Sequence, residues 1–402
     1  MTLDIGGTDR AARPPATSRI GAILALAVLA LYVLFGVVVG LHTHARLGPS
    51  GAPLFYDFSA FYEAGRFADA GHAAAAYDDK AMIAAERAAF PGITVRLPWN
   101  YPPSFQMLFM PLAALPYVAA WLIWSSVLYG LYALLARRLL PTRDLWVALL
   151  LPAAAINLLV GQNGFLSTVL MGAGVLALER RPIVGGVLLG LLSYKPHFAV
   201  LAPVLLVFTR QWRALGGAVV SGAALLLLSL AILGPDAWLA FADKALHPAV
   251  FTSSSSDWRN IPSVQILART LGLPPVAASV LHWAVALAAT VGAAWVWRRS
   301  DDARLRAGAL AAATLLVTPY LRLYDLTLLI LPIAALMAPA DGEPGLGERA
   351  ILVVAWLAPA VLLFTPPGVQ LGPLVTLALM ALVLWRMRRT AGSTMRLTLH
   401  AS

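Results

Sequence analysis

Four ionisable residues of this 402-residue sequence stand among apolar or aromatic neighbours: Asp57, Lys195, Arg322 and Asp325. A charged side chain is expensive to keep in such surroundings, and one that is retained usually serves a function or a pairing. Carboxylates can accept protons and cations can bind anions, so these four side chains are the first candidates for catalysis or binding.

Asp57 lies in the aromatic-rich run Leu54–Tyr62. A carboxylate among apolar rings loses hydration, which raises its pKa and suits it to act as a general base. The alternative is a structural role, because Asp is also a favourable N-cap and could start a short interfacial helix through Phe58–Ala70. Both interpretations fit the sequence.

Lys195 precedes a proline and is followed closely by His197. A fixed ammonium group could neutralise an anion such as a phosphate, whereas a snorkelling lysine would send its charged end to water. His197 either assists anion binding or is an interior histidine with its hydrogen bonds satisfied.

Arg322 and Asp325 follow Thr318-Pro319-Tyr320 in a predicted outer turn. Their i, i+3 spacing would let the two side chains pair with each other on one face of a helix. A mutual ion pair is therefore the structural alternative to a role in substrate binding.

Two further motifs have adequate local explanations. Gly161-Gln162-Asn163-Gly164 is a tight turn in which glycine permits positive φ and the amides offer donors and acceptors. Asn100-Tyr101-Pro102-Pro103 marks the start of a helix, since proline is tolerated in the first turn. Neither motif specifies a function by itself.

The elements that hold these residues must be membrane helices. Of all residues 60% are hydrophobic and 12% are charged, whereas a soluble domain carries about a quarter charged residues. The net charge of +10 agrees with basic loops retained on the cytoplasmic side and gives no reason to expect nucleic-acid binding. The chain has no cysteine, no zinc-binding histidine spacing, and neither a Walker-type phosphate motif nor GxGxxG. We therefore predict no metal and no cofactor.

Arginine clusters divide the apolar sequence into membrane crossings. Ile20–Leu41 is an uninterrupted apolar run after Arg19. It is long enough to cross about 30 Å of hydrocarbon, so we predict a retained first helix with a cytoplasmic N-terminus. Later clusters mark alternate ends of the apolar runs, as the positive-inside rule requires. The further predicted crossings are 117–136, 144–160, 163–178, 214–233, 276–297, 306–320, 324–338, 350–365 and 369–386.

The segment between Arg181 and Arg210 breaks this pattern, because both ends are basic and neither apolar half is long enough to cross. We predict a broken re-entrant hairpin with its apex at Ser193–His197. The sequence thus predicts an all-α integral membrane protein with about ten transmembrane helices, this hairpin and an outer interfacial loop. Its predicted parts are a cytoplasmic tail at 1–19, a membrane domain at 20–390 that includes the first outer loop at 42–100, and a cytoplasmic tail at 391–402.

In their order along the chain, several short motifs resemble those of glycosyltransferase family 87, whose members use polyprenyl-phosphate sugars and have the GT-C membrane fold. The resemblance spans residues 55–330. The matching elements are Asp57-Phe58 with Tyr62 and Gly65, Tyr77-Asp78, Tyr101-Pro102-Pro103, Pro111, Gly161-Gln162-Asn163, Lys195-Pro196 and Arg210-Gln211-Trp212-Arg213.

The resemblance implies a membrane glycosyltransferase that moves a hexose from a polyprenyl-phosphate donor to an acceptor hydroxyl on a glycan or glycolipid. In the family an aspartate of the first outer loop is the proposed catalytic base, and Asp57 occupies this place. Lys195, Arg322 and His197 would bind the donor phosphate, and direct displacement would invert the anomeric carbon without a metal. Further substrate-site candidates are Tyr62, Tyr101, Gln162, Asn163, Tyr320, Tyr324 and Asp325.

One signature departs from the family pattern. Members that transfer mannose are expected to carry Ser-Pro followed by Trp and His, whereas this chain has Thr318-Pro319-Tyr320 leading to Tyr324-Asp325. The sugar, mannose or another hexose, therefore stays open.

A transporter or lipid flippase is the alternative class, because such proteins also have broken helices and intramembrane charges. Their folds usually contain repeated halves, however, and here the long loop after the first helix has no counterpart in the second half. We therefore predict a multi-pass enzyme of the inner cell membrane, in contact with membrane lipids, whose active site faces the periplasm or the cell exterior.

Overall fold

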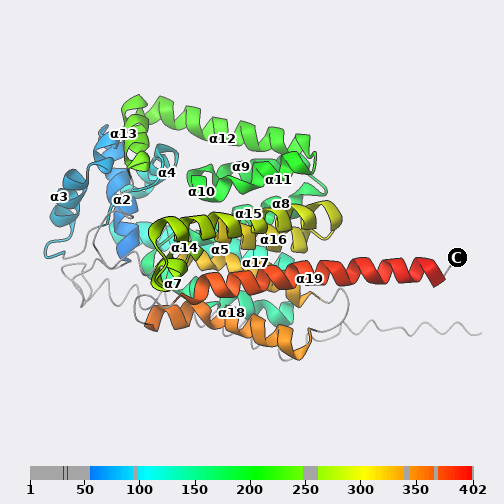
Figure 1. The fold of residues 1–402 in the computed structure, drawn as a ribbon. Helices are drawn as coiled ribbons and strands as arrows, with labels where there is room; N and C mark the ends of the chain where they lie inside the picture. The colour runs from blue at the N-terminus through cyan, green and yellow to red at the C-terminus, as the bar shows by residue number, and fades with distance from the viewer. Residues whose placement is uncertain are drawn as a thin grey trace, which may run out of the picture.

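The computed structural model describes Ala30, Leu34 and residues 55–93, 97–247, 261–338, 344–365 and 370–400. Throughout these residues the chain forms helices and connecting segments, with no β-strand (Figure 1). Apart from Ala30 and Leu34, the predicted first crossing at Ile20–Leu41 lies outside the described residues, as does the start of the outer loop at 42–54. The described part of the chain is an all-helical protein.

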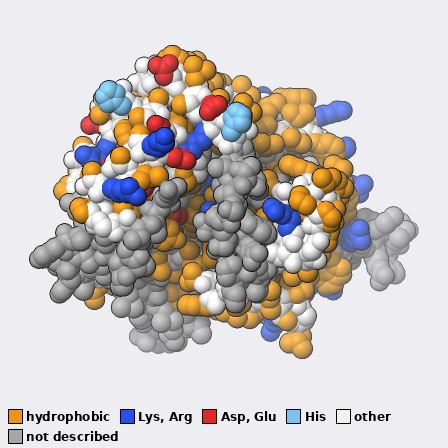
Figure 2. All heavy atoms as spheres, turned by 60° about the vertical axis from the view of Figure 1, so that its left-hand side comes forward, with side chains coloured by type: hydrophobic (Ala, Val, Ile, Leu, Met, Phe, Trp, Pro, Cys, Tyr) orange, Lys and Arg blue, Asp and Glu red, His pale blue; other side chains and the backbone are white. Residues whose placement is uncertain are grey.

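Short helices lie together at one end of the molecule. They are α2 (Tyr56–Asp69), the 3-10 helix η1 (Ala73–Tyr77), α3 (Asp79–Ala89), α4 (Pro103–Ala113) and α13 (Pro235–Leu246). Figure 1 shows α2, α3 and α13 grouped at this end, and η1 contacts both α2 and α13. In Figure 2 charged and histidine side chains gather on the same end, whereas hydrophobic side chains cover much of the adjoining flank. This polar end is the setting of the site.

An aromatic core holds α2 against α4. The rings of Phe61 and Phe109 lie 4.9 Å apart, and those of Phe105 and Phe109 lie 5.1 Å apart. The two helices approach closely, because a Cβ on Gly65 would lie 2.6 Å from the Phe109 carbonyl oxygen. Helix α4 begins with Pro103, as the proline pair in the sequence predicts. The position of α2 is therefore fixed by close aromatic packing against α4.

The remaining helices form the bundle. They are η2 (Thr142–Asp144), η3 (Leu192–Tyr194), η6 (Leu323–Leu329), α5 (Tyr117–Leu139), α6 (Leu145–Leu149), α7 (Pro152–Val160), α8 (Gly164–Leu178), α9 (Pro182–Leu191), α10 (Pro196–Ala199), α11 (Leu201–Phe208), α12 (Trp212–Leu233), α14 (Val264–Thr270), α15 (Pro275–Arg299), α16 (Ala303–Val317), α17 (Ile330–Met337), α18 (Leu346–Phe364) and α19 (Leu371–His400). Helix α19 continues into the segment predicted as a C-terminal tail.

Five described helices are long and apolar enough to cross a membrane: α5, α12, α15, α18 and the Leu371–Arg389 part of α19. The pair Thr142–Leu149 and Pro152–Val160 is long and apolar enough when taken together, but it is bent by 49°. Other predicted crossings fall on shorter helices; α8 and α16 have 15 residues each, too few at 1.5 Å per residue to cross about 30 Å. The described part is therefore a helical membrane protein with fewer full-length spans than the ten predicted.

The segment 182–208 is broken at the predicted apex. Helix α9 ends at Leu191, η3 follows, and the chain resumes as α10 and α11 after Lys195. Thr318 directly follows α16, and its hydroxyl donates a hydrogen bond of 3.4 Å to the His197 carbonyl. The apex of the hairpin therefore lies beside the C-terminal end of α16.

Helices α9 and α12 run parallel in close contact. A Cβ on Gly186 would collide with the Ala214 carbonyl, and one on Gly190 would collide with the Ala218 carbonyl. Since both helices advance in the same direction, the intervening α10 and α11 must return toward the start of α12. Small residues at such a contact let membrane helices approach closely. This geometry agrees with the predicted re-entrant hairpin.

Candidate functional site

Asp57 lies in the first turn of α2, and its carboxylate does not cap that helix. The helix begins at Tyr56, and no side chain caps its N-terminus. Instead, Gln162 Nε2 donates a hydrogen bond of 3.0 Å to Asp57 Oδ2. The helix-capping alternative for Asp57 is wrong, because its carboxylate is directed at a distant part of the chain.

The residue before α2, Phe55, has a left-handed backbone conformation with φ 56° and ψ 48°. A non-glycine residue in this region costs about 1 to 3 kcal/mol and persists only where the surroundings hold it. Here the Phe55 ring stacks on Trp121 with centroids 3.4 Å apart, and the Tyr117 hydroxyl donates a hydrogen bond of 3.2 Å to the Phe55 carbonyl. This turn fixes the direction in which α2, and with it Asp57, starts. No sequence motif indicated it.

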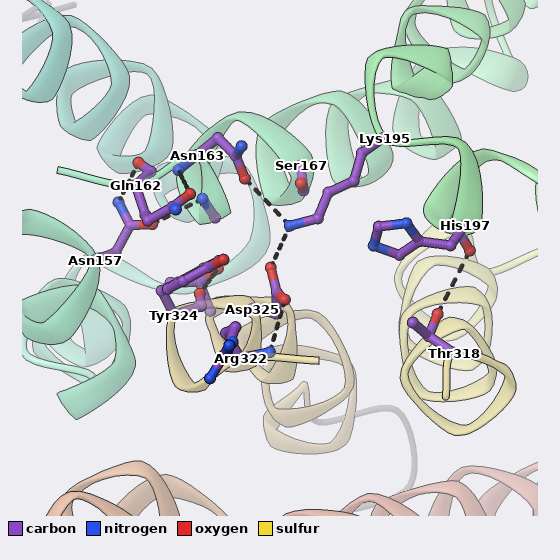
Figure 3. Close-up of polar contacts among 12 residues, drawn as sticks. Asn157, Gln162, Asn163, Ser167, Lys195, His197, Thr318, Arg322, Tyr324 and Asp325 are labelled. Carbon is purple, nitrogen blue, oxygen red and sulfur yellow. Dashed lines mark hydrogen bonds and ion pairs between the residues drawn. The ribbon is translucent and has the colours of Figure 1, made fainter. Parts of the chain in front are cut away.

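The turn between α7 and α8 carries Gln162 to Asp57. Gly161 ends α7 with a positive φ of 73°, and a Cβ there would lie 2.5 Å from the Phe58 Cβ. Glycine therefore lets the turn approach α2. Gln162 Oε1 accepts a hydrogen bond of 3.2 Å from the Tyr101 hydroxyl. It also accepts one of 3.1 Å from the Asn163 N–H, and Figure 3 shows these two neighbouring residues. Turn chemistry alone does not account for this motif, because its glutamine contacts Asp57.

Lys195 and Asp325 form a buried ion pair at the centre of the site (Figure 3). Lys195 Nζ lies 2.5 Å from Asp325 Oδ1, and the two side chains are 3% and 2% exposed. Lys195 also donates a hydrogen bond of 3.2 Å to Asn163 Oδ1. The other carboxylate oxygen of Asp325 accepts a hydrogen bond of 3.0 Å from the Arg322 backbone N–H. The snorkelling alternative for Lys195 is wrong, because its ammonium group is enclosed and paired.

Arg322 does not use its side chain to pair with Asp325. Its Nε donates a hydrogen bond of 3.3 Å to the Tyr320 hydroxyl, and its guanidinium carbon lies 5.4 Å from the centre of that ring. Among the residues that the structure describes, no carboxylate forms an ion pair with this guanidinium. Instead of a side-chain ion pair, Arg322 and Asp325 are joined by the backbone hydrogen bond described above. The Arg322 guanidinium forms no ion pair within the described part of the chain, although the Asp57 carboxylate is near enough to influence it.

The surroundings of Asp57 raise the pKa of its carboxyl group to about 6. Burial is the largest cause, and the nearby Asp325 carboxylate adds to it. The Gln162 hydrogen bond and the positive charges of Arg322 and Lys195 oppose the rise. Asp57 is therefore ionised at neutral pH yet has a higher proton affinity than an exposed aspartate, which suits a general base.

The aromatic candidates divide into site residues and supporting residues. Tyr101 donates to Gln162, and the Tyr324 ring lies 5.3 Å from Lys195 Nζ. Tyr320 contacts Arg322 as described above. Tyr62 instead donates a hydrogen bond of 2.7 Å to the Leu115 carbonyl, so its hydroxyl supports the packing around α2. Tyr56, which no sequence motif indicated, precedes Asp57 and is 41% exposed.

His197 lies at the hairpin apex, on the Lys195 side of the cluster in Figure 3. Its carbonyl accepts the Thr318 hydrogen bond, whereas its half-buried ring makes no hydrogen bond to any described residue. The alternative that His197 is an interior histidine with all its hydrogen bonds satisfied is therefore wrong for the described part of the chain. It remains available to a ligand.

The described residues contain no group of three His, Cys, Asp or Glu side chains placed to hold a metal ion. The site combines one half-buried carboxylate, one guanidinium that forms no ion pair with a described residue, and a set of hydrogen-bonded amides and phenols. Such an arrangement can remove a proton from a hydroxyl group and bind an anion beside it.

Comparison with known proteins identifies one family. The sequence profile of Glycosyltransferase family 87 matches residues 99–319, more than half of the chain. Gln162, Asn163 and Lys195 lie within the matched segment, whereas Asp57 and Asp325 lie outside it. No curated protein and no solved structure matches the chain.

Proposed function

Because the chain belongs to glycosyltransferase family 87, we propose that this membrane glycosyltransferase moves a hexose from a polyprenyl-phosphate donor to an acceptor hydroxyl. The observation that carries the proposal is the proximity of Asp57, a half-buried carboxylate, to Arg322, whose guanidinium forms no ion pair with any described residue. The two charges are close enough for Arg322 to lower the proton affinity of Asp57. A base and an anion site thus lie side by side.

In the proposed reaction, Asp57 removes the proton of the acceptor hydroxyl while its oxygen attacks the anomeric carbon of the donor sugar. The bond between that carbon and the phosphate oxygen breaks, and the polyprenyl phosphate leaves with the bonding electrons. One displacement inverts the anomeric centre. Asp57 Oδ1 accepts no hydrogen bond from the described residues, so this oxygen is available to the acceptor.

The departing phosphate gains negative charge, and we assign its stabilisation to Arg322. His197 lies on the Lys195 side of the cluster (Figure 3) and could assist from there. Lys195 was the first phosphate-binding candidate from the sequence, but Asp325 already neutralises its charge. A paired ammonium attracts an anion less than a guanidinium without a counter-ion does. In the proposal, Lys195 therefore supports the site by fixing Asp325, which in turn holds the backbone of Arg322. The mechanism requires no metal.

The decisive experiment is Asp57→Asn, assayed with purified protein, a polyprenyl-phosphate hexose and a glycolipid acceptor. Asn keeps the size of the side chain but cannot accept the proton, so turnover should fall by about 10² to 10⁴ while donor binding changes little. The matched control is Asp302→Asn, because Asp302 does cap its helix: it accepts a hydrogen bond of 2.7 Å from the Arg304 N–H. Asn is nearly as good a cap, so this variant should keep its turnover. Wild-type transfer by Asp57→Asn would remove Asp57 from the mechanism.

We further propose that the site faces the periplasm or the cell exterior. The polar end with α2 and α13 lies away from the arginine-rich start of α12, which the positive-inside rule assigns to the cytoplasm. The cysteine-free chain allows a direct test with single cysteines at Ala70 and Glu179. An impermeant thiol reagent added outside intact cells should label Ala70→Cys and leave Glu179→Cys unlabelled. The reverse pattern would overturn the orientation.

A further inference from the structure

The side-chain amide of Gln162 makes hydrogen bonds through both its nitrogen and its oxygen: the nitrogen donates to Asp57 Oδ2. Its Oε1 accepts from both the Tyr101 hydroxyl and the Asn163 N–H. A backbone N–H can only donate, so the side-chain atom that faces it must be the oxygen. The amide nitrogen must then point toward Asp57. The network thus fixes which end of the amide meets the carboxylate.

We propose that Gln162 is a positioning residue for Asp57: it holds Oδ2, leaves Oδ1 free for the acceptor hydroxyl, and favours the ionised carboxylate. This inference rests on the proposed function and extends it to a residue that touches neither sugar nor phosphate. An amide N–H can donate to a carboxylate but offers nothing to the acid's own proton, so the contact stabilises the charged form.

The same network links Asp57 to the buried ion pair. Asn163 donates its backbone N–H to Gln162 and accepts from Lys195 through its side chain. The ion pair therefore anchors the turn that carries Gln162. Rigid support of this kind keeps a reactive group in its productive geometry.

Other charged and titratable groups also face Asp57, and they must be held constant in any test. Arg322 and Asp325 approach from the segment that enters η6, and Lys195 approaches from the hairpin apex. Three phenols lie around the same carboxylate: Tyr56 on α2, Tyr101 before α4, and Tyr324 on η6. Substitution of Gln162 alone removes none of these groups, although the Tyr101 hydroxyl then loses the acceptor it has on Gln162.

The test compares Gln162→Met with Gln106→Met. Gln106 is a matched control: it is fully buried and donates hydrogen bonds of 3.0 Å to the Ala64 and Ala73 carbonyls, without contact to Asp57. Two readouts are measured as functions of pH. One is kcat, and the other is the infrared carboxyl band that disappears in Asp57→Asn, which needs no substrate.

In Gln162→Met the midpoint of the carboxyl band and the acidic limb of kcat should both move upward by about one pH unit, since a hydrogen bond to a charged group is lost. The donor KM should change less than about twofold, because Gln162 does not touch the donor in the proposal. Gln106→Met should leave both midpoints in place. Gln162→Glu is the second variant: it keeps an acceptor for Asn163 but replaces the donor with a like charge, so it should shift both midpoints further.

Unchanged midpoints in both Gln162 variants would overturn the inference and leave Gln162 as an ordinary turn residue. Failure of the proposed function looks different: Asp57→Asn would then transfer sugar like the wild-type protein. The infrared midpoint still tests the contact between Gln162 and Asp57 in that event, because it reports ionisation without catalysis.

Discussion

Asp325 uses both of its carboxylate oxygens inside the protein, whereas Asp57 uses one. Asp325 is buried between Lys195 and the Arg322 backbone, so its charge is neutralised and its position is fixed. Asp57 is half-buried and held by a neutral amide, and its Oδ1 accepts no hydrogen bond from a residue that the structure describes. The two aspartates therefore differ in how many carboxylate oxygens the described residues bind. Asp325 holds Lys195 and the Arg322 backbone in place, whereas Asp57 keeps one oxygen that a substrate could reach in the proposed reaction.

The largest effect that tests this comparison should come from Lys195→Met. Removing the ammonium leaves Asp325 buried without its partner, which should reduce the free energy of unfolding by about 3 to 5 kcal/mol. The double variant Lys195→Met with Asp325→Leu should recover much of that loss, because it removes both charges. Thermal unfolding in lipid nanodiscs measures both effects. Wild-type stability together with lost donor binding in Lys195→Met would make Lys195 a phosphate ligand instead.

Arg322→Met should show the opposite pattern, with a loss of activity and little change in stability. Without the guanidinium the departing phosphate loses its stabilising charge, so kcat/KM for the donor should fall by about 10². Arg66→Met is the matched control, because this arginine at the same end of the molecule already pairs with Glu63 at 3.4 Å. Equal losses of activity in the two variants would show that the general positive charge of this end, not Arg322, attracts the donor.

The pH dependence of transfer should follow the ionisation of Asp57. Its pKa of about 6 lies above the ordinary value for aspartate, and only the ionised form can accept a proton. Turnover should therefore be maximal above pH 7 and fall about tenfold for each unit below the pKa. A kcat profile that stays flat from pH 7 to pH 4 would contradict a base with this pKa.

Glu86 on α3 should give the smallest effect. It is a third buried acid, and it lies outside the cluster that contains Asp57 and Asp325. Its Oε1 has no hydrogen-bond partner among the described residues, and burial raises its pKa to about 7. Its folded pKa exceeds the ordinary value of 4.5, so its ionisation destabilises the fold progressively above about pH 4.5, fully above about pH 7, and not at all well below pH 4.5. Glu86→Gln should raise Tm by a few degrees at pH 8 and not at pH 4. An equal gain at both pH values would exclude ionisation as the cause.

Sequence patterns predicted the parts of this site that depend on local physics. The break at Lys195 follows from a proline between two short apolar runs with basic ends, and the structure breaks the helix there. The start of α4 follows from the proline pair. Each of these features depends on residues that are neighbours in the chain.

Features that depend on long-range contacts were not predictable in this way. Asp325 meets Lys195 across 130 positions, and spacing alone suggested Arg322 as its partner. The alternative in which Asp57 caps a helix would start that helix at Phe58, but the helix starts at Tyr56, after the left-handed turn at Phe55. That turn depends on packing against α5, which no local propensity encodes.

The strained turn at Phe55 also sets an order of assembly during biosynthesis. Residue 55 leaves the ribosome well before Tyr117 and Trp121, the two residues that hold its conformation. Until α5 is in place, the Tyr117 and Trp121 contacts that hold Phe55 are missing, so we expect the loop around Asp57 to adopt other conformations. A chain whose synthesis or insertion stops before α5 therefore has the sequence around Asp57 but not a correctly directed carboxylate.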